Sequence, residues 1–348
     1  MEQITTKHHA PKNVNAITVD WLRISFDPSS WKFACALFDI DYTAQEWADT
    51  NKYMKNYGTM AMDGVFIGAE ALPTVVNGDM EIEGRFIVDF TGNGLGVYFE
   101  QNPTYTVANL LRMCLEQEDA RVLRIDIAFD DYNGYLDIMG MAKMLQQSSD
   151  VSRVITRWRG WELRMSGEMF SDDAGTTLYI GSRSSNSFGR VYDKRAQLMA
   201  TEGFKPAALP PSWIRFELEI KSKKAHAVAE AAMKNNFNSS YFAGVLRGLI
   251  EFKEGKREDH KKANMKTARW WSKFLNDSEA VSVRVPLPVA SIEKKKEWLS
   301  KSVATTLALV QHHYEGDMQF IHDLLANGDR RLTPAHLALL NSVDTHGA

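Results

Sequence analysis

Alternating hydrophobic and polar positions predict a series of β-strands along the first two thirds of the chain. Runs of β-branched and aromatic residues with Gly and Asn-Gly turn signals predict further short strands over 64–100. Side chains at alternate positions of a strand point to opposite faces, so each strand has two distinct faces. The clearest strands are AITVDWLRISF (16–26), RVLRIDIAFDD (121–131), TTLYIGS (176–182), FGRVYDK (188–194) and LPPSWIRFELEIKS (209–222).

Other segments have helical patterns, and from residue 223 onward this pattern dominates. Thr43 and Glu46 have capping-box spacing at the start of one of these segments. Prolines in VRVPLPVAS (283–291) predict a connector, and GNGLG (92–96) predicts a β-turn. The predicted helices are TAQEWADTNKYMKNYG (43–58), TVANLLRMCLEQ (106–117), LDIMGMAKMLQQ (136–147) and KKAHAVAEAAMKNN (223–236).

This order of elements predicts an α+β fold. We expect a mixed, mainly antiparallel sheet with helices packed on one face, followed by a smaller, mainly helical region. The predicted domains are residues 1–225 and 226–348.

Composition narrows the class of protein. The 348 residues include 44% hydrophobic ones, which suits a globular protein with a sizeable core, and no apolar run approaches membrane-spanning length. The start lacks a secretory signal, and two cysteines, Cys35 and Cys114, give no disulfide framework. We therefore expect a cytoplasmic protein without a membrane partner.

Charge is distributed unevenly along the chain. Residues 1–120 hold 8 Lys and Arg against 17 Asp and Glu, whereas residues 121–301 hold 31 against 22. Within the second segment, residues 253–273 hold eight basic against three acidic residues and end near Trp270-Trp271. Such a segment is typical of a surface that attracts a polyanion, although an uneven surface without a partner is also compatible with it. The tryptophans would either stack on unpaired bases or anchor a helix to the core.

Three strands each combine an apolar face with an ionisable one. For any one of these strands, the ionisable face could simply be exposed to solvent and form cross-strand ion pairs. Together, the three faces favour metal-assisted phosphoryl transfer, in which carboxylates bind Mg²⁺ or Mn²⁺, arginines bind phosphate and nearby cations stabilise a tyrosine phenolate. In 121–131 the predicted apolar face holds Leu123, Ile125, Ile127 and Phe129. The ionisable faces hold Arg124, Asp126 and Asp130; Arg190, Tyr192 and Lys194; and Arg215, Glu217, Glu219 and Lys221.

Four of these segments occur in an order that resembles a known family. RIDIAFDD, TLYIGSRSS, FGRVYDKRAQ and SWIRFELEIK are similar to motifs of the Rep_trans replication initiation factors, the rolling-circle initiators of certain small plasmids and filamentous phages. VDWLRISF and IVDFTGNGLGVYFE also resemble the family's N-terminal strands, so the resemblance covers roughly residues 17–225.

The resemblance implies that residues 1–225 form a nicking domain with Tyr192 as the nucleophile. This relaxase-like endonuclease would cut one strand at a double-strand origin, form a 5′-phosphotyrosyl link, leave a 3′-OH that primes synthesis, and later rejoin the strand. Arg190 and Lys194 would assist catalysis, and Arg183 would contact phosphate. The metal ligands, for Mg²⁺ or Mn²⁺, would come from Asp126, Glu217, Glu219, Asp89 and Asp130.

Further basic residues are predicted to contact DNA: Arg215, Lys221, Lys261, Lys262, Lys266 and Arg269. The resemblance also implies a homodimer, a host helicase as partner, and a bacterial cytoplasm. An alternative is a non-catalytic, sequence-specific DNA-binding initiator or repressor, which leaves the acidic faces unexplained. A tyrosine recombinase is disfavoured because its His-x-x-Arg element is missing.

Overall fold

A computed structural model gives the fold. It describes residues 16–38, 48–49, 58–62, 65–69, 74–77, 79–147, 152–166, 175–255, 262–280, 299–314 and 316–330, together with the single positions 292, 296 and 332. The chain divides into two compact units, Met1–Val285 and Pro286–Ala348. Among the described residues, no helix has the length and apolar character needed to cross a membrane.

Ten described strands form one sheet, and every strand pair in it is antiparallel. A second sheet has the order β15 (Lys266–Thr267), β14 (Ile250–Glu254) and β9 (Val154–Thr156), and β5 (Thr74–Val76) pairs with β6 (Asp79–Glu81). The order of the large sheet is β10 (Trp161–Ser166), β11 (Gly175–Ile180), β12 (Ser187–Asp193), β13 (Ile214–Lys221), β8 (Arg121–Asp131), β1 (Ala16–Phe26), β7 (Phe86–Phe90), β4 (Val65–Ala69), β3 (Gly58–Met62) and β2 (Ala48–Asp49).

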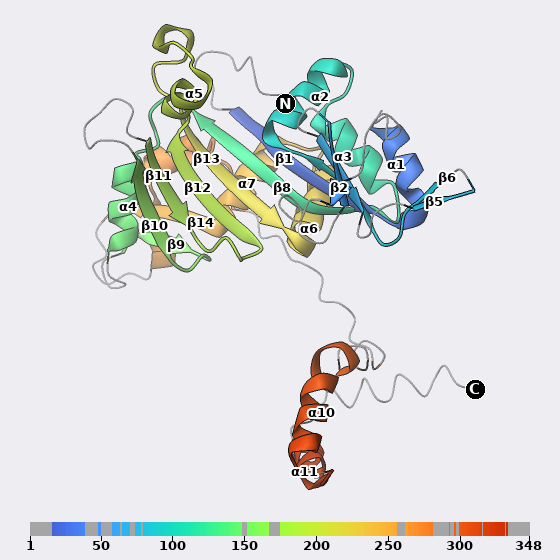
Figure 1. Cartoon of the computed structure of the whole chain (residues 1–348). Coiled ribbons are helices and arrows are strands. Elements are labelled where there is room, and N and C mark those ends of the chain that lie inside the picture. The colour runs from blue at the N-terminus through green and yellow to red at the C-terminus, as the bar shows by residue number, and fades with distance from the viewer. Residues whose placement is uncertain are drawn as a thin grey trace. The chain divides into compact units, whose positions relative to one another are not determined.

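Helices connect the strands and cover one face of the large sheet, so the predicted α+β class is confirmed; Figure 1 shows α6 and α7 behind the sheet. The second unit contains a π-helical turn, η4 (Leu299–Val303), and helices α10 (Ala304–His313) and α11 (Gln319–Asp329). The helices of the first unit are α1 (Trp31–Leu37), α2 (Gly92–Gln101), α3 (Val107–Leu115), α4 (Ile138–Gln146), α5 (Lys194–Glu202), α6 (Ser222–Lys234), α7 (Ser239–Leu249) and α8 (Arg269–Phe274), with 3₁₀ turns η1 (Pro28–Ser30), η2 (Pro206–Ala208) and η3 (Lys262–Asn264).

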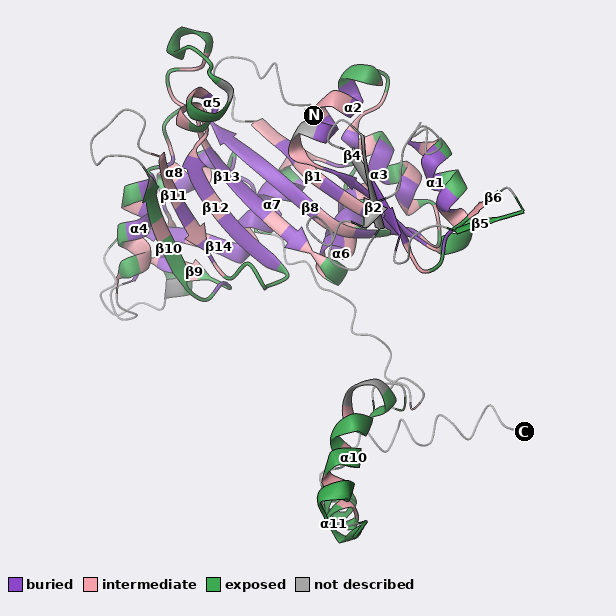
Figure 2. Cartoon of the chain, viewed as in Figure 1, coloured by how far each residue is buried: buried purple, intermediate pink, exposed green. Residues whose placement is uncertain are grey.

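The core lies between the apolar face of the sheet and these helices. Ile125, Ile127 and Phe216 from the strands are buried in one cluster with Val228 of α6 and Phe242 of α7. In Figure 2 the central strands are coloured as buried, whereas α10 and α11 are coloured mainly as exposed. Because α6 and α7 complete the core under the sheet, the predicted domain boundary after residue 225 falls inside the first compact unit.

Two predicted elements differ from the structure. In the segment 43–58, the described residues Ala48–Asp49 and Gly58 belong to strands β2 and β3, so an uninterrupted helix is excluded and strand pairing overrides the helical pattern. The predicted strands and turn of 64–100 end earlier than expected, because Gly92–Gln101 forms α2. The Thr91 hydroxyl caps this helix by accepting a hydrogen bond from the Gly94 backbone N–H. The predicted connector 283–291 lies outside the described residues.

The face assignment of β8 also needs one correction. Val122 is buried in the core, whereas Leu123 is only partly buried. The register between β1 and β8 shifts between Arg23 and Ile24, as in a β-bulge, so the alternation that holds from Arg124 onward does not continue to the start of the strand. The predicted apolar face of Ile125, Ile127 and Phe129 is confirmed.

Trp158 packs beneath the strands that carry the candidate nucleophile. Its Nε1 donates to Ser187 Oγ at 3.0 Å, and its ring lies close to Gly181 and Gly189. A Cβ atom at Gly189 would approach this ring and Phe216 to 3.2 Å. Trp158 is therefore a packing residue. Positions 181 and 189 require glycine because the indole ring lies against their backbone and leaves little room for a Cβ atom.

We expect Gly181→Ala to lower the free energy of unfolding by about 2–5 kcal/mol. Gly181 has φ +90°, and its added Cβ would lie 3.0 Å from the Trp158 ring. Gly203→Ala is a matched control, because Gly203 has φ +69° but no atom within 4 Å of an added Cβ; it should lose only about 1–2 kcal/mol. Urea denaturation followed by circular dichroism measures both. Equal losses would show that the tryptophan contact contributes nothing.

Candidate active site

The antiparallel register assembles the predicted ionisable faces into rows that cross β12, β13 and β8. These rows lie on the face of the sheet opposite the buried apolar residues, as the strand alternation predicted. In one row the β8 position is Ala128, so no charged side chain of that strand lies directly opposite Glu217. From β12 to β8, the rows are Tyr192–Arg215–Asp130, Arg190–Glu217–Ala128 and Phe188–Glu219–Asp126.

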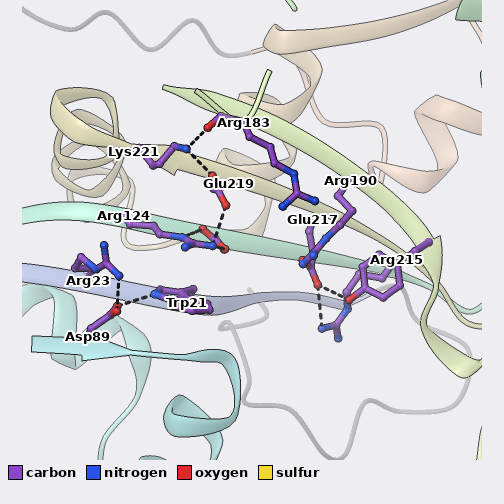
Figure 3. A network of polar contacts seen from close by, with 12 residues as sticks. Trp21, Arg23, Asp89, Arg124, Arg183, Arg190, Arg215, Glu217, Glu219 and Lys221 are labelled. Atoms are coloured by element: carbon purple, nitrogen blue, oxygen red, sulfur yellow. Dashed lines mark hydrogen bonds and ion pairs between the residues drawn. The ribbon is translucent and has the colours of Figure 1, made fainter. Parts of the chain in front are cut away.

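Tyr192 directs its hydroxyl toward a carboxylate. The side chain is 7% exposed, its Oη donates to Oε1 of Glu217, and Nη2 of Arg190 donates to Oε2 of the same group. Nη1 of Arg215 lies 4.0 Å from Oε1 of Glu217. Figure 3 shows Arg190, Glu217 and Arg215 converging at one place. The phenol is thus hydrogen-bonded to a carboxylate that lies between two arginines.

The phenol is protonated at neutral pH. Burial raises the pKa of Tyr192 above its ordinary value, and the charge of Glu217 raises it further, while Arg215 and Arg190 act in the opposite direction. The neighbouring arginines stabilise the phenolate, as expected, but burial and the charge of Glu217 outweigh them, so the pKa of Tyr192 is raised in this state of the protein. Attack by Tyr192 requires that its proton leave, and Glu217 already accepts the hydrogen bond that this proton forms.

A second cluster lies along the same strands. Arg124 donates from Nε to Oδ1 of Asp126 at 2.8 Å, and its Nη2 lies 2.8 Å from Oε2 of Glu219. Lys221 Nζ lies 2.8 Å from the other oxygen of Glu219. Burial raises the pKa of Asp126 to about 7; Arg124 opposes this shift, while Glu219 and Glu217 add to it. Asp126 and Glu219 are opposed in register and share one arginine.

The other two predicted metal ligands bond to different groups. Asp89 is fully buried and accepts hydrogen bonds of 2.6 Å from Trp21 Nε1 and Arg23 Nη2. Asp130 accepts hydrogen bonds from Trp213 and from both Nε and Nη2 of Arg215, at 2.7–2.8 Å. These contacts place both aspartates in ion pairs that hold neighbouring strands together.

Among the described residues, no group of three or more His, Cys, Asp or Glu side chains is arranged to hold a metal ion. The facing pair of Asp126 and Glu219 still fits Mg²⁺, because this ion is commonly bound by one or two carboxylates with water and substrate phosphate as the remaining ligands. Arg124 now contacts both carboxylates. Of the five predicted ligands, these two remain the best candidates.

Three predicted catalytic or DNA-contacting residues are placed differently from the expectation. Lys194 begins α5 and donates to Gln197, so it lies beyond the end of β12, and the alternation that groups it with Tyr192 does not extend to it. Arg215 is 2% exposed and also lies 3.1 Å from Asp20, so its guanidinium is engaged within the protein instead of facing DNA. Lys221 is half-buried beside Glu219.

The remaining predicted DNA contacts are exposed where the structure describes them. Arg183 lies in the connection between β11 and β12, Lys266 lies in β15, and Arg269 begins α8. Lys261 lies outside the described residues, and the side chain of Lys262 is likewise outside them.

The tryptophans near this basic segment belong to the core. Trp271 has no exposed surface, and its ring centroid lies 5.0 Å from that of Phe252 and 6.1 Å from that of Phe216. Trp270 is partly buried and also packs on Phe252. Trp270 and Trp271 therefore anchor α8 to the core and do not serve as stacking surfaces for bases.

Sequence reasoning missed the groups that hold the carboxylates. The strand alternation predicts the correct face for Arg124 but does not indicate its role, which is to contact two acidic side chains. Trp21 and Arg23 were not singled out, although they bind Asp89 and come from β1. Their alternate spacing in VDWLRISF was a usable signal, but the pairing of β1 with β7 and β8 was needed to interpret it.

The chain is similar to known proteins in sequence and in fold. NicK of Bacillus subtilis (strain 168), provisionally named a DNA relaxase, is 25% identical over 228 residues; these cover 64% of this chain and 62% of NicK, less than two thirds of that relative. A solved structure of a rolling circle replication initiator protein from Geobacillus stearothermophilus matches with a TM-score of 0.59. That match covers 79% of this chain and 100% of the other, at 22% identity, and it establishes a shared fold.

A family match completes the comparison. The family Rep_trans, described as replication initiation factor, matches residues 120–325, which is more than half of the chain. The matched region contains β8, β12 and β13, and therefore Asp126, Tyr192 and Glu217. The protein belongs to the Rep_trans family of replication initiation factors.

Proposed function

We propose that the protein nicks one strand of DNA at a replication origin and later rejoins it, with Tyr192 as the nucleophile. The single observation that carries this proposal is the hydrogen bond from the Tyr192 hydroxyl to Glu217, within a cluster that also contains Arg190 and Arg215. Membership of a replication initiation family and the likeness to NicK support the same assignment.

The reaction is a transesterification at phosphorus. The Tyr192 oxygen forms a bond to the phosphorus atom, its proton passes to Glu217, and the bond from phosphorus to the 3′ oxygen breaks. The leaving oxygen takes a proton from water and becomes a 3′-OH that can prime synthesis, while the 5′ phosphate stays on Tyr192. Arg190 lies beside Tyr192 and would stabilise negative charge on the phosphate as the bonds exchange. The reverse reaction rejoins the strand.

A divalent ion would act beside these residues. Asp126 and Glu219 would hold Mg²⁺ or Mn²⁺, and the ion, when bound, would neutralise charge on the phosphate and on the leaving oxygen. Arg124 would have to give up part of its contact with the two carboxylates when the ion binds.

Mapping the covalent adduct tests the function. The protein is incubated with a labelled oligonucleotide that contains the origin of the replicon encoding it, digested with trypsin, and analysed by mass spectrometry. The label should be found on the tryptic peptide that contains Tyr192. Labelling of a different tyrosine would contradict the assignment. Specific DNA binding without any adduct or nick, with and without EDTA, would support the alternative of a non-catalytic initiator or repressor.

We expect Asp126→Asn and Glu219→Gln to weaken Mn²⁺ binding by about tenfold or more, since each removes one of two charged ligands. Isothermal titration calorimetry measures this without any DNA. Glu162→Gln is the matched control, because Glu162 is an exposed carboxylate on the same sheet that pairs with Arg164. Unchanged Mn²⁺ affinity in both site variants would exclude this pair as the metal ligands.

The homodimer, the host helicase and the bacterial cytoplasm stay predictions from the family resemblance. The exposed Arg183, Lys266 and Arg269 are compatible with a DNA-binding surface, and their contribution would appear as a salt-dependent affinity.

A further inference from the structure

An aromatic pair lies next to the candidate nucleophile on the same face of the sheet. Tyr179 of β11 and Phe188 of β12 stack with their ring centroids 5.8 Å apart and their planes 19° from parallel. The guanidinium of Arg183, from the connection between the two strands, lies 5.0 Å from the Tyr179 centroid and 5.6 Å from the Phe188 centroid. Arg164 of β10 approaches Tyr179 to 5.3 Å. We call Tyr179, Phe188 and Arg183 the stacking platform.

Strand register places this platform beside the reacting groups. Tyr179 is the direct partner of Arg190, whose guanidinium binds Glu217. Phe188 is two residues before Arg190 on β12 and therefore has the same facing as Arg190 and Tyr192. A DNA strand with its phosphate at Tyr192 would reach the platform with an adjacent nucleotide, because neighbouring strands are only about 5 Å apart.

Packing alone does not account for the platform. Trp158 and Trp271 lie under the sheet and are buried in the core, whereas Tyr179 is only partly buried and Arg183 is exposed. Phe188 is 6% exposed and supports the Tyr179 ring from below, so Tyr179 and Arg183 are the accessible members of the platform. Arg164 is paired with Glu162 at 2.8 Å. Within the described part of the chain, Arg183 has no acidic group at ion-pair distance, although Glu162 is near enough for Arg183 to influence its pKa. Arg183 therefore keeps donors that can bind phosphate.

We propose that the stacking platform binds an unpaired nucleotide adjacent to the phosphodiester that Tyr192 attacks. This inference rests on the proposed nicking function and specifies its substrate. An aromatic ring can stack on any base whose face is uncovered, and an arginine can bind the base face or a neighbouring phosphate. A base inside a duplex is covered on both faces by its neighbours, so the strand must be unpaired next to the nick site.

The test measures DNA binding in the Tyr192→Phe background with EDTA present, so no bond is broken. The probes are a fluorescein-labelled oligothymidylate of about 20 nucleotides and a labelled mixed-sequence duplex of about 20 base pairs. Tyr179→Leu should weaken oligothymidylate binding by about tenfold and leave duplex binding within about twofold, because it removes one stacking surface. Tyr179→Phe keeps the ring and should bind both probes as the parent does.

Arg183→Ala should weaken oligothymidylate binding and reduce the slope of log affinity against log salt by about 0.7, the value for one phosphate contact to a single strand. Arg112→Ala is its matched control: Arg112 is an exposed arginine on α3 that lies over the ring of Phe237, at 5.9 Å, and not beside Tyr192. This variant should keep both the affinity and the slope. Thermal unfolding verifies that each variant is folded.

The proposal that the platform binds an unpaired nucleotide would be contradicted if Tyr179→Leu left the affinity for oligothymidylate unchanged. It would also be contradicted if this variant lost the same affinity for both probes. Failure of the nicking proposal has a different signature, since it would appear as a missing adduct on Tyr192 in the mapping experiment. The two results come from separate measurements and can be distinguished.

Discussion

Tyr192→Phe should abolish the covalent protein–DNA adduct and reduce nicking of a supercoiled origin plasmid by about four orders of magnitude or more. Phenylalanine keeps the ring that packs beside Arg190 but removes the oxygen that would attack phosphorus. DNA binding should change little, because the hydroxyl donates to Glu217 inside the protein. Agarose gels measure nicking, and denaturing gels with labelled DNA measure the adduct.

Tyr241→Phe is the matched control for this variant. Tyr241 is also a buried tyrosine whose hydroxyl makes a hydrogen bond, in this case to the backbone oxygen of Val228 at 3.2 Å. Its removal should cost about 1 kcal/mol of stability and leave nicking intact. Persistent adduct formation by Tyr192→Phe would show that another residue is the nucleophile.

Glu217→Gln should lower the nicking rate by about 10²–10⁴-fold at neutral pH, because the amide cannot accept the Tyr192 proton as a base. The loss should shrink as pH rises. Glu217 raises the pKa of Tyr192, so removing its charge should lower that pKa and allow phenolate to form in alkaline solution without a base. Single-turnover nicking rates across a pH series measure this dependence.

Glu251→Gln is the control for the loss of a carboxylate. Glu251 of β14 lies 3.0 Å from Arg247 of α7 and from Lys253 of β14, and β14 belongs to a different sheet from the one that carries Tyr192. This variant should nick at the wild-type rate and lose only stability. A Glu217→Gln rate that stays low at every pH would argue that Glu217 positions Tyr192 without taking its proton.

The composition of the ionisable face of the sheet was predictable from the sequence because it depends on local periodicity. Alternation along β12 and β13 correctly placed Arg190 with Tyr192 and Glu217 with Glu219. The errors of this sequence-based prediction also came from local features of the chain. Lys194 lies beyond the predicted strand because a helix begins there, and Val122 is buried in the core beside a shift in the register of β1 and β8.

Contacts between strands required the structure. A single sequence does not state that β13 lies between β12 and β8, and only this order puts Glu219 opposite Asp126 and Glu217 within reach of the Tyr192 hydroxyl. The pairing of Tyr179 with Arg190 was hidden for the same reason. The burial of Tyr192 could not be predicted from the sequence either. This burial explains why the pKa of Tyr192 rises although two arginines are close.

The position of Tyr192 on strand β12 restricts how such a sequence can evolve. In the connection between β11 and β12, the residues after Arg183 lie outside the strands, so this part of the loop can gain or lose residues without changing the register that places Tyr192. A single insertion between Phe188 and Tyr192 would instead rotate the phenol onto the hydrophobic side of the sheet and away from Glu217. Length variation among homologues should therefore be concentrated in the loop and excluded from the strand.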